Sequence, residues 1–148
     1  MDLTVAITGA TRGIGRAVAE AFVDGGAFVA VSGRAGDAVD RTVAALNGAG
    51  DDQDAEADGD ADAGDDSPAD DAERGTAWGD RVDVRDEFDL ERFFERAARE
   101  AGPIDVVFAN AGVFHGAPGE RPTTEVTYAD YDDTMRTNAR GVFATITE

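Results

Sequence analysis

Two patterns of hydrophobic and polar positions alternate along the chain. Short, nearly continuous apolar runs predict strands over residues 3–8, 28–32, 81–84 and 104–109. The segments between these runs carry apolar residues three or four positions apart. This spacing predicts amphipathic helices over 14–25 and 37–46, between Asp86 and Gly102, and from Thr127 to the end of the chain.

Each predicted helix has one apolar face, and several have recognisable ends. Asp86 can cap the third helix, Gly25 and Gly26 end the first, and Thr127-x-x-Asp130 forms a capping box for the fourth. The apolar faces are Ile14, Val18, Ala21 and Phe22; Val39, Val43 and Leu46; Leu90, Phe93, Phe94, Ala97 and Ala101; and Tyr131, Met135, Val142 and Ile146.

Alternation of strands and helices at this spacing is typical of the α/β class, in which right-handed crossovers join parallel strands and helices cover both faces. We therefore expect a doubly wound, Rossmann-like parallel sheet with strand order 3-2-1-4. The apolar run at 104–109 is typical of a strand buried on both faces. Its outer edge would be open to association.

Residues 50–73 interrupt the pattern. They are almost wholly Asp, Ala and Gly, with twelve acids and no base. Such a segment has no apolar surface to bury, so we predict a disordered insertion between a helix and a strand. The chain is then one partial dinucleotide-binding domain, 1–148, with an acidic insertion at 50–73.

The acidity of the chain narrows its range of partners. Thirty-two acids oppose thirteen bases, all of them arginine, giving a net charge of −19 that repels nucleic acid phosphates and anionic lipid. Outside 50–73 there are still 20 acids against 13 bases. This balance favours a salt-loving source, where screening removes the repulsion between carboxylates. Arginine-rich codon usage together with one unusual insertion is the alternative.

Other features are absent from the sequence. It has no cysteine, which excludes disulfides and thiolate metal sites, and we predict no metal site. No apolar run approaches the roughly 18 residues of a membrane span, and no basic stretch precedes one as in a signal peptide. We therefore expect a cytoplasmic protein that binds neither membrane nor nucleic acid.

The clearest chemical signal is the turn Thr8–Gly15, which lies between a predicted strand and a predicted helix. Gly9 permits a tight turn, Gly13 lets the backbone approach a pyrophosphate, and Gly15 lets the helix pack close to the strand. The helix N-terminus offers free N–H groups and partial positive charge to phosphates. The turn, including Thr11, Arg12 and Ile14, is a candidate dinucleotide site; a glycine turn without a ligand is the alternative.

The glycine spacing, Gly-x-x-x-Gly-x-Gly, resembles that of the short-chain dehydrogenase/reductase family. Three further segments match that family in the expected order: Asp83-Val84, Asn110-Ala111-Gly112, and Asn138 within the segment 138–143. The resemblance covers the whole chain except the acidic insertion. It implies hydride transfer between a nicotinamide cofactor and a small carbonyl or alcohol substrate.

The resemblance also implies roles for these residues. Asp83 and the Val84 N–H would contact the adenine, and the backbone of Asn110–Gly112 would pass close to the ribose. Asn138 would be the catalytic asparagine that holds a water in the proton relay. The alternatives are a solvated carboxylate at Asp83, a structural side chain at Asn110 and a satisfied amide at Asn138.

The end of the second predicted strand bears on the choice of cofactor. Proteins that bind NAD usually place Asp or Glu there, to hold the ribose 2′-hydroxyl. Here Gly33 fills that place and Arg34 follows. Arg34 can pair with a 2′-phosphate, with Arg12 and Ser32 as further contacts. We therefore expect NADP rather than NAD; a solvated arginine is the alternative.

The family's remaining catalytic groups are a serine and a Tyr-x-x-x-Lys motif, and this sequence contains no lysine. Tyr128 and Tyr131 precede Asn138, in the wrong helix for the motif. We therefore expect a fragment, a frameshifted gene or part of a split protein, inactive alone and a homo-oligomer in its full-length form. A non-catalytic dinucleotide-binding module is the second hypothesis. A related lyase or epimerase, disfavoured by the glycine spacing, is the third.

Overall fold

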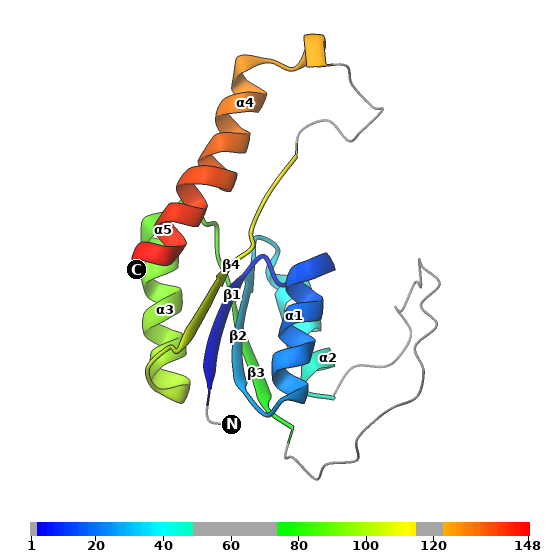
Figure 1. The fold of residues 1–148 in the computed structure, drawn as a ribbon, viewed down its shortest axis with the longest axis vertical. Helices are drawn as coiled ribbons and strands as arrows, with labels where there is room; N and C mark the ends of the chain where they lie inside the picture. The colour runs from blue at the N-terminus through cyan, green and yellow to red at the C-terminus, as the bar shows by residue number, and fades with distance from the viewer. Residues whose placement is uncertain (1–2, 49–73, 115–122) are drawn as a thin grey trace, which may run out of the picture.

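The computed structural model describes residues 3–48, 74–114 and 123–148, so the predicted insertion at 50–73 lies outside the described residues. Four strands form one parallel sheet in the order β3-β2-β1-β4, which confirms the predicted fold (Figure 1). The strands are β1 (Thr4–Thr8), β2 (Phe28–Gly33), β3 (Thr76–Arg81) and β4 (Val106–Ala109). The helices are α1 (Gly13–Asp24), α2 (Gly36–Leu46), α3 (Glu87–Ala101), the short 3-10 helix η1 (Thr123–Glu125), α4 (Tyr128–Met135), the π-helical segment η2 (Arg136–Gly141) and α5 (Val142–Thr147).

The strand register gathers the predicted site residues at one edge of the sheet. Thr8, the last residue of β1, pairs with Ser32 of β2 on one side and with Ala109 of β4 on the other. Gly33 of β2 pairs with Arg81, where β3 ends. The carboxyl ends of all four strands therefore meet at the same edge, which is where open α/β sheets bind ligands.

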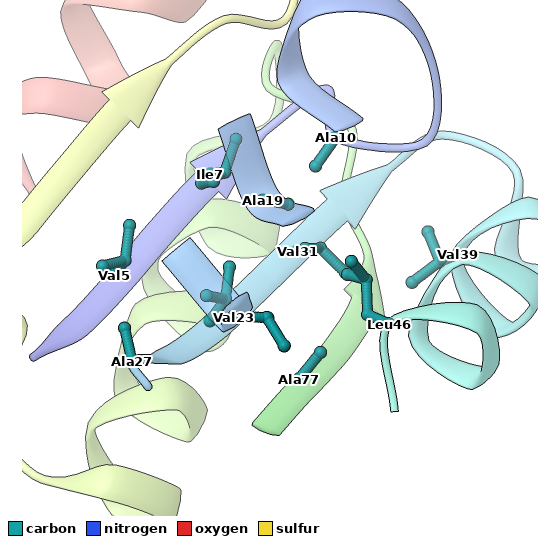
Figure 2. Packing of buried hydrophobic residues seen from close by; sticks show 11 residues of the cluster. Val5, Ile7, Ala10, Ala19, Val23, Ala27, Val31, Val39, Leu46 and Ala77 are labelled. Atoms are coloured by element: carbon teal, nitrogen blue, oxygen red, sulfur yellow. The ribbon is translucent and has the colours of Figure 1, made fainter. Parts of the chain in front are cut away.

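Helices cover both faces of the sheet, and each face has its own apolar core. Alternate strand residues point to opposite faces, so Val5, Ile7, Val29 and Val31 pack with Val23, Val39 and Leu46 of α1 and α2 (Figure 2). On the other face, Ala6 and Ala30 pack with Leu90, Phe93, Phe94 and Ala97 of α3. Phe28 of β2 and Trp78 of β3 pack against the same cluster, and Phe93 stacks on Trp78 with ring centroids 5.9 Å apart.

The third strand lies earlier in the chain than the sequence predicted. The predicted range 81–84 overlaps β3 only at Arg81, and the strand is formed by Thr76–Arg81. Gly79 and Asp80 disfavour strand structure, which hid this element. Packing against α2 favours glycine at position 79, because a Cβ there would come within 2.6 Å of the Val39 side chain. Val82 continues the ladder by one bond, its N–H donating to Gly33 O at 2.9 Å.

The buried face of α1 also differs from the prediction. Gly15, Ala19 and Val23 are buried, while Ile14 is 72% exposed. Val18 and Phe22 are partly buried against the same core. The helix therefore packs closely on β1 through a face of small residues. Such a face is not found by looking for large apolar side chains at helical spacing.

The predicted C-terminal helix has the predicted start but is not continuous. Thr127 and Asp130 form a reciprocal capping box at the start of α4. The helix then widens into the π-helical segment η2 before α5 begins. Tyr131, Met135 and Ile146, predicted as part of its apolar face, are 41–62% exposed. Among the described residues, no helix is long and apolar enough to cross a membrane.

One side chain joins the elements on either side of the predicted insertion. Asn47, which follows α2, donates from Nδ2 to Ala77 O at 2.9 Å and accepts at Oδ1 from Ala77 N at 2.8 Å. A single amide thus satisfies both backbone groups of a residue in β3 and fixes the end of α2 to the sheet.

Candidate functional site

A cavity of about 460 Å³ opens at the carboxyl edge of the sheet. Its wall is made by the turn after β1, the end of β2, the segment after β3, the segment after β4, and η2. Ten of the predicted site residues line it: Gly9, Thr11, Arg12, Gly13, Ser32, Arg34, Val84, Asn110, Ala111 and Gly112. The other lining residues are Gly33, Ala35, Val82, Val113 and Thr137. Four predicted residues do not line it: Ile14, Gly15, Asp83 and Asn138.

The backbone geometry explains why glycine stands at positions 9, 13 and 15 of the turn. Gly9 has φ +71°, and a Cβ there would meet the Ala111 backbone at 2.7 Å. Gly13 has φ +57° with open space where a Cβ would stand. A Cβ at Gly15 would collide with Gly9 O and with the Asn110 side chain. The turn therefore combines two left-handed glycines with one close contact between α1 and the strand ends.

The first turn of α1 presents its backbone N–H groups without competition from the side chains in the described parts of the chain. Its N-cap, Arg12, makes no side-chain capping bond, and no acidic residue lies in the first turn. A helix N-terminus carries unsatisfied N–H groups and partial positive charge. Because the space at Gly13 is open, these N–H groups can donate hydrogen bonds to a phosphate there.

The side chain of Asn110 joins the ends of β4 and β1. Its Nδ2 donates to Gly9 O at 2.8 Å, and the N–H of the next residue, Ala111, donates to Thr8 Oγ1 at 3.4 Å. These bonds hold the glycine turn against the segment after β4. The geometry agrees with the structural role that the sequence left open for this side chain.

Among the described residues, Arg12 and Arg34 line the cavity and no carboxylate does. In the described parts of the chain neither Arg12 nor Arg34 forms an ion pair, although carboxylates outnumber bases in this protein. Eight other described arginines do pair with a carboxylate: Arg16, Arg41, Arg74, Arg85, Arg92, Arg96, Arg99 and Arg140. The cavity therefore holds two uncompensated positive charges.

Neighbouring groups fix the backbone beside these arginines. Arg81, at the end of β3, donates from Nε to Arg34 O at 3.1 Å. Ser32 is buried, and its hydroxyl lies 3.5 Å from Ile7 O, a long bond to the β1 backbone. A Cβ at Gly33 would come within 2.7 Å of the Thr11 side chain. Gly33 therefore lets the end of β2 approach the glycine turn.

Asp83 lies between two cavity-lining residues, but its own side chain is held elsewhere. Arg85 donates from Nε to Oδ1 at 2.9 Å and from Nη2 to Oδ2 at 2.6 Å. The Nη1 of the same guanidinium donates to Asp133 Oδ1, on α4, at 2.6 Å. The side-chain hydrogen bonds from Arg85 hold the pKa of Asp83 below its usual value of 3.8, although partial burial opposes them. The pKa of Arg85 is raised in turn by Asp83.

Asn138 lies in η2, next to the cavity-lining Thr137. Its side chain bonds to the backbone of Val113, beyond the strand end of β4: Nδ2 donates to the carbonyl and Oδ1 accepts from the N–H, both at 2.7 Å. The backbone of η2 also approaches the wall after β3, where a Cβ at Gly141 would come within 2.7 Å of Val84. Isolated π-helical turns are frequent at functional sites.

The structure adds lining residues that sequence reasoning missed. Val82 and Val113 directly neighbour predicted residues, so widening each motif by one position would have included them. Thr137 precedes Asn138, and Ala35 follows Arg34. No sequence signal pointed to Arg85, because its contact with Asp133 spans 48 positions. Among the described residues, no group of three or more His, Asp or Glu side chains is placed to hold a metal ion.

Comparisons with known proteins agree with this geometry. A family model described as "short chain dehydrogenase" matches residues 3–69, and one described as "Enoyl-(Acyl carrier protein) reductase" matches residues 62–148, more than half of the chain. The D-threitol dehydrogenase of Mycolicibacterium smegmatis is 34% identical over 137 residues, covering 93% of this chain and 42% of the relative. The uncharacterized oxidoreductase YvrD of Bacillus subtilis is 50% identical over 110 residues, covering 74% and 32% respectively.

Solved structures show the same fold. The crystal structure of levodione reductase superposes with a TM-score of 0.76 at 25% identity, covering all of this chain and 48% of the other. A 3-ketoacyl-ACP reductase from Sinorhizobium meliloti gives a TM-score of 0.72 at 28% identity, covering 97% and 46%. The chain thus spans less than half the length of the relatives it matches. By family models, relatives and fold together, this chain belongs to the short-chain dehydrogenase/reductase family.

Proposed function

We propose that this chain binds NADP(H) in the cavity at the carboxyl edge of the sheet, as the cofactor-binding part of an oxidoreductase. The protein it belongs to would transfer hydride between the nicotinamide and a small carbonyl or alcohol substrate. The observation that carries the proposal is the lining that the described residues form: a glycine turn with open space at Gly13, and two arginines with no carboxylate partner among those residues.

The charges of the lining favour NADP over NAD. A carboxylate after β2 would hold a ribose 2′-hydroxyl and repel a 2′-phosphate. Here Gly33 and Arg34 stand there instead, and Arg12 lies on the same wall. Guanidinium groups bind phosphate through charge-assisted, often bidentate hydrogen bonds. Pairing Arg34 with a 2′-phosphate would also neutralise a charge that no described carboxylate neutralises.

The remaining lining residues fit the other parts of a dinucleotide. The N–H groups of α1 and the turn Gly9–Gly13 would hold the pyrophosphate. Val82 and Val84 would form an apolar wall for the adenine, with the Val84 N–H as a polar contact at its edge. Asp83 lies next to this lining and would accept from the adenine amino group with lone pairs that its bonds to Arg85 leave free. Ser32 and Asn110–Gly112 would complete the lining toward the ribose groups. The bound cofactor would supply the hydride.

Asn138 is the proposed catalytic residue of this chain. Its amide uses one N–H of Nδ2 and one lone pair of Oδ1 to bond Val113. The second N–H and the second lone pair can bind a water. Asn138 would hold that water beside the cavity, and η2 would set its position. The serine, tyrosine and lysine that the family uses for proton transfer have no counterpart motif in this lysine-free sequence.

A binding module without catalysis is the second candidate function, in which the same cavity would bind the cofactor. Both candidates predict cofactor binding, so a binding measurement does not separate them. Under either, we expect this chain alone to consume no NADPH over a panel of carbonyl compounds, because a positioned acid/base contributes roughly 10²–10⁴-fold to such reactions. Turnover of NADPH by this chain would overturn that expectation and exclude the second candidate.

The cofactor proposal is tested by calorimetric titration of NADPH and NADH. We expect wild type to bind NADPH more tightly, and Arg34→Ala to weaken NADPH binding by about tenfold while leaving NADH binding unchanged. Arg41→Ala is the matched control, because Arg41 is an exposed arginine of α2 outside the cavity. Equal effects of Arg34→Ala on the two cofactors would overturn the NADP assignment.

We propose in addition that the protein works in a salt-rich cytoplasm and assembles with copies of itself. The acid excess and the use of arginine alone as a base support the first part. Exposed apolar side chains at Tyr131, Met135, Phe143 and Ile146 support the second. Light scattering tests self-association, and thermal unfolding at low and high salt tests salt adaptation. A monomer at every salt concentration would overturn self-association, and stability that falls as salt rises would overturn salt adaptation.

A further inference from the structure

The backbones of Asp83, after β3, and Arg34, after β2, lie close together in the sheet. The Val82 N–H donates to Gly33 O at 2.9 Å, which joins the two chain segments. Asp83 is the residue after Val82, and Arg34 is the residue after Gly33. Arg34 and both neighbours of Asp83 line one cavity. The pKa of Asp83 is lowered chiefly by the side-chain hydrogen bonds from Arg85, and the positive charge of Arg34 adds a smaller lowering. An arginine and an aspartate so placed would ordinarily be expected to pair.

Asp83 pairs with Arg85 instead. Its guanidinium donates to both carboxylate oxygens, and its backbone N–H donates to Oδ1 at 3.0 Å. The other side of the guanidinium is held by Asp133 on α4. The three side chains are only 23–33% exposed, whereas Arg34 is exposed and has no carboxylate partner among the described residues. The more buried, bidentate pair is the stronger one.

This arrangement has a consequence for anion binding. A carboxylate paired with Arg34 would compete with any phosphate for the same guanidinium, and would repel that phosphate as well. We propose that Arg85 is a positioning residue for cofactor specificity: by holding Asp83, it keeps Arg34 available to a 2′-phosphate. This inference rests on the proposed NADP function and assigns part of its specificity to a residue outside the cavity lining.

The experiment compares adenosine 2′,5′-bisphosphate with AMP, which share the adenosine and differ in the 2′-phosphate. Dissociation constants are measured by calorimetry at one fixed ionic strength for wild type, Arg85→Gln, Asp83→Asn, Asp83→Asn/Arg85→Gln and Asp133→Asn. The readout is the ratio of the two constants. Loss of adenine contacts or of general stability changes both constants together and leaves this ratio unchanged.

We expect Arg85→Gln to lower the preference for the bisphosphate by about two- to fivefold, the range for an exposed ion pair. The double variant should restore the wild-type ratio, because the carboxylate released in Arg85→Gln is then absent. Asp83→Asn alone should keep or raise the ratio. Asp133→Asn is the control: it loosens α4 but leaves Asp83 bound, and should keep the ratio.

The outcomes separate this inference from the function on which it rests. No preference for the bisphosphate in wild type would overturn the proposed function. A wild-type preference that Arg85→Gln preserves, or that the double variant fails to restore, would overturn only the role of Arg85. If Arg85→Gln does not fold, as judged by Trp78 fluorescence, Arg85→Lys replaces it. An ammonium cannot bind both oxygens in the same way, so we expect an intermediate ratio, and an unchanged one would overturn the inference.

Discussion

Asn138 and Val113 form a closed pair in which one side-chain amide bonds both backbone groups of a single residue, at 2.7 Å in each direction. Asn47 and Ala77 form the same arrangement, at 2.9 and 2.8 Å. In both cases the asparagine lies on or beside a helix and its partner lies in or after a strand. These amides complete backbone hydrogen bonding where no neighbouring strand does so.

Substituting these asparagines by aspartate tests the pairing with almost no change in shape. The carboxylate keeps the acceptor for the N–H but faces the carbonyl with an oxygen, so Asn47→Asp should lower the free energy of unfolding by about 1–3 kcal/mol. Asn138 is exposed, so Asn138→Asp should have the smaller effect, about 1 kcal/mol. Urea denaturation measures both. A larger effect at Asn138 would contradict this account.

The two glycines in the first turn of α1 should respond differently to substitution by alanine. Gly15→Ala places a methyl group against a backbone oxygen and should lower the free energy of unfolding by about 1–3 kcal/mol or more. Gly13→Ala meets no atom and only strains a left-handed φ, which costs about 1 kcal/mol. Its methyl group would still obstruct the cavity wall. Gly13→Ala should therefore weaken NADPH binding far more than it weakens the fold.

The ion pair between Asp83 and Arg85 predicts a specific acid sensitivity. The folded-state pKa of Asp83 lies below its usual 3.8, so the pair's contribution to stability is complete above about pH 4. It is lost as the pH falls through the folded-state pKa. The difference in unfolding free energy between wild type and Asp83→Asn should therefore shrink as the pH falls below 4. A difference that stays constant or grows in acid would count against the pair.

The aromatic contact under α3 should dominate the stability of the second core. Phe93 is fully buried, stacks on Trp78 and meets Phe94 edge-on at 5.4 Å. Phe93→Ala should therefore lower the free energy of unfolding by about 3–5 kcal/mol, a large part of the stability of such a domain. Phe88→Ala, at a residue 79% exposed on the same helix, is the control and should change little. Trp78 fluorescence follows both transitions.

Much of the fold could be predicted from sequence because local signals determined it. The glycine turn, the Asp86 cap and the Thr127–Asp130 box depend on residues within a few positions of one another, and the structure contains all three. The order of strands followed from the alternation of elements. Ten of the fourteen predicted site residues also line one cavity, because they follow strand ends that a parallel sheet brings together.

The errors have a common physical origin in tertiary contacts. The segment Trp78–Asp80 has no strand pattern in the sequence, yet it pairs with β2. Arg96 covers the Trp78 ring and also forms an ion pair with Asp80. Ile14 reads as a core residue, but the close approach that Gly15 permits turns Ile14 outward. The link from Arg85 to Asp133 on α4 joins residues 48 positions apart, so no local sequence signal could reveal it.

The Asn47–Ala77 pair also bears on how this chain can change in length. Two nearby bonds reinforce it: Gly75 N–H to Val23 O at 2.8 Å, and Arg74 to Asp24 at 2.9 Å. Together they anchor both ends of the sequence that separates α2 from β3. The entropy of closing a loop grows only with the logarithm of its length, so each doubling adds about 0.6 kcal/mol. We therefore expect that residues can be added or removed between α2 and β3 while the sheet keeps its register.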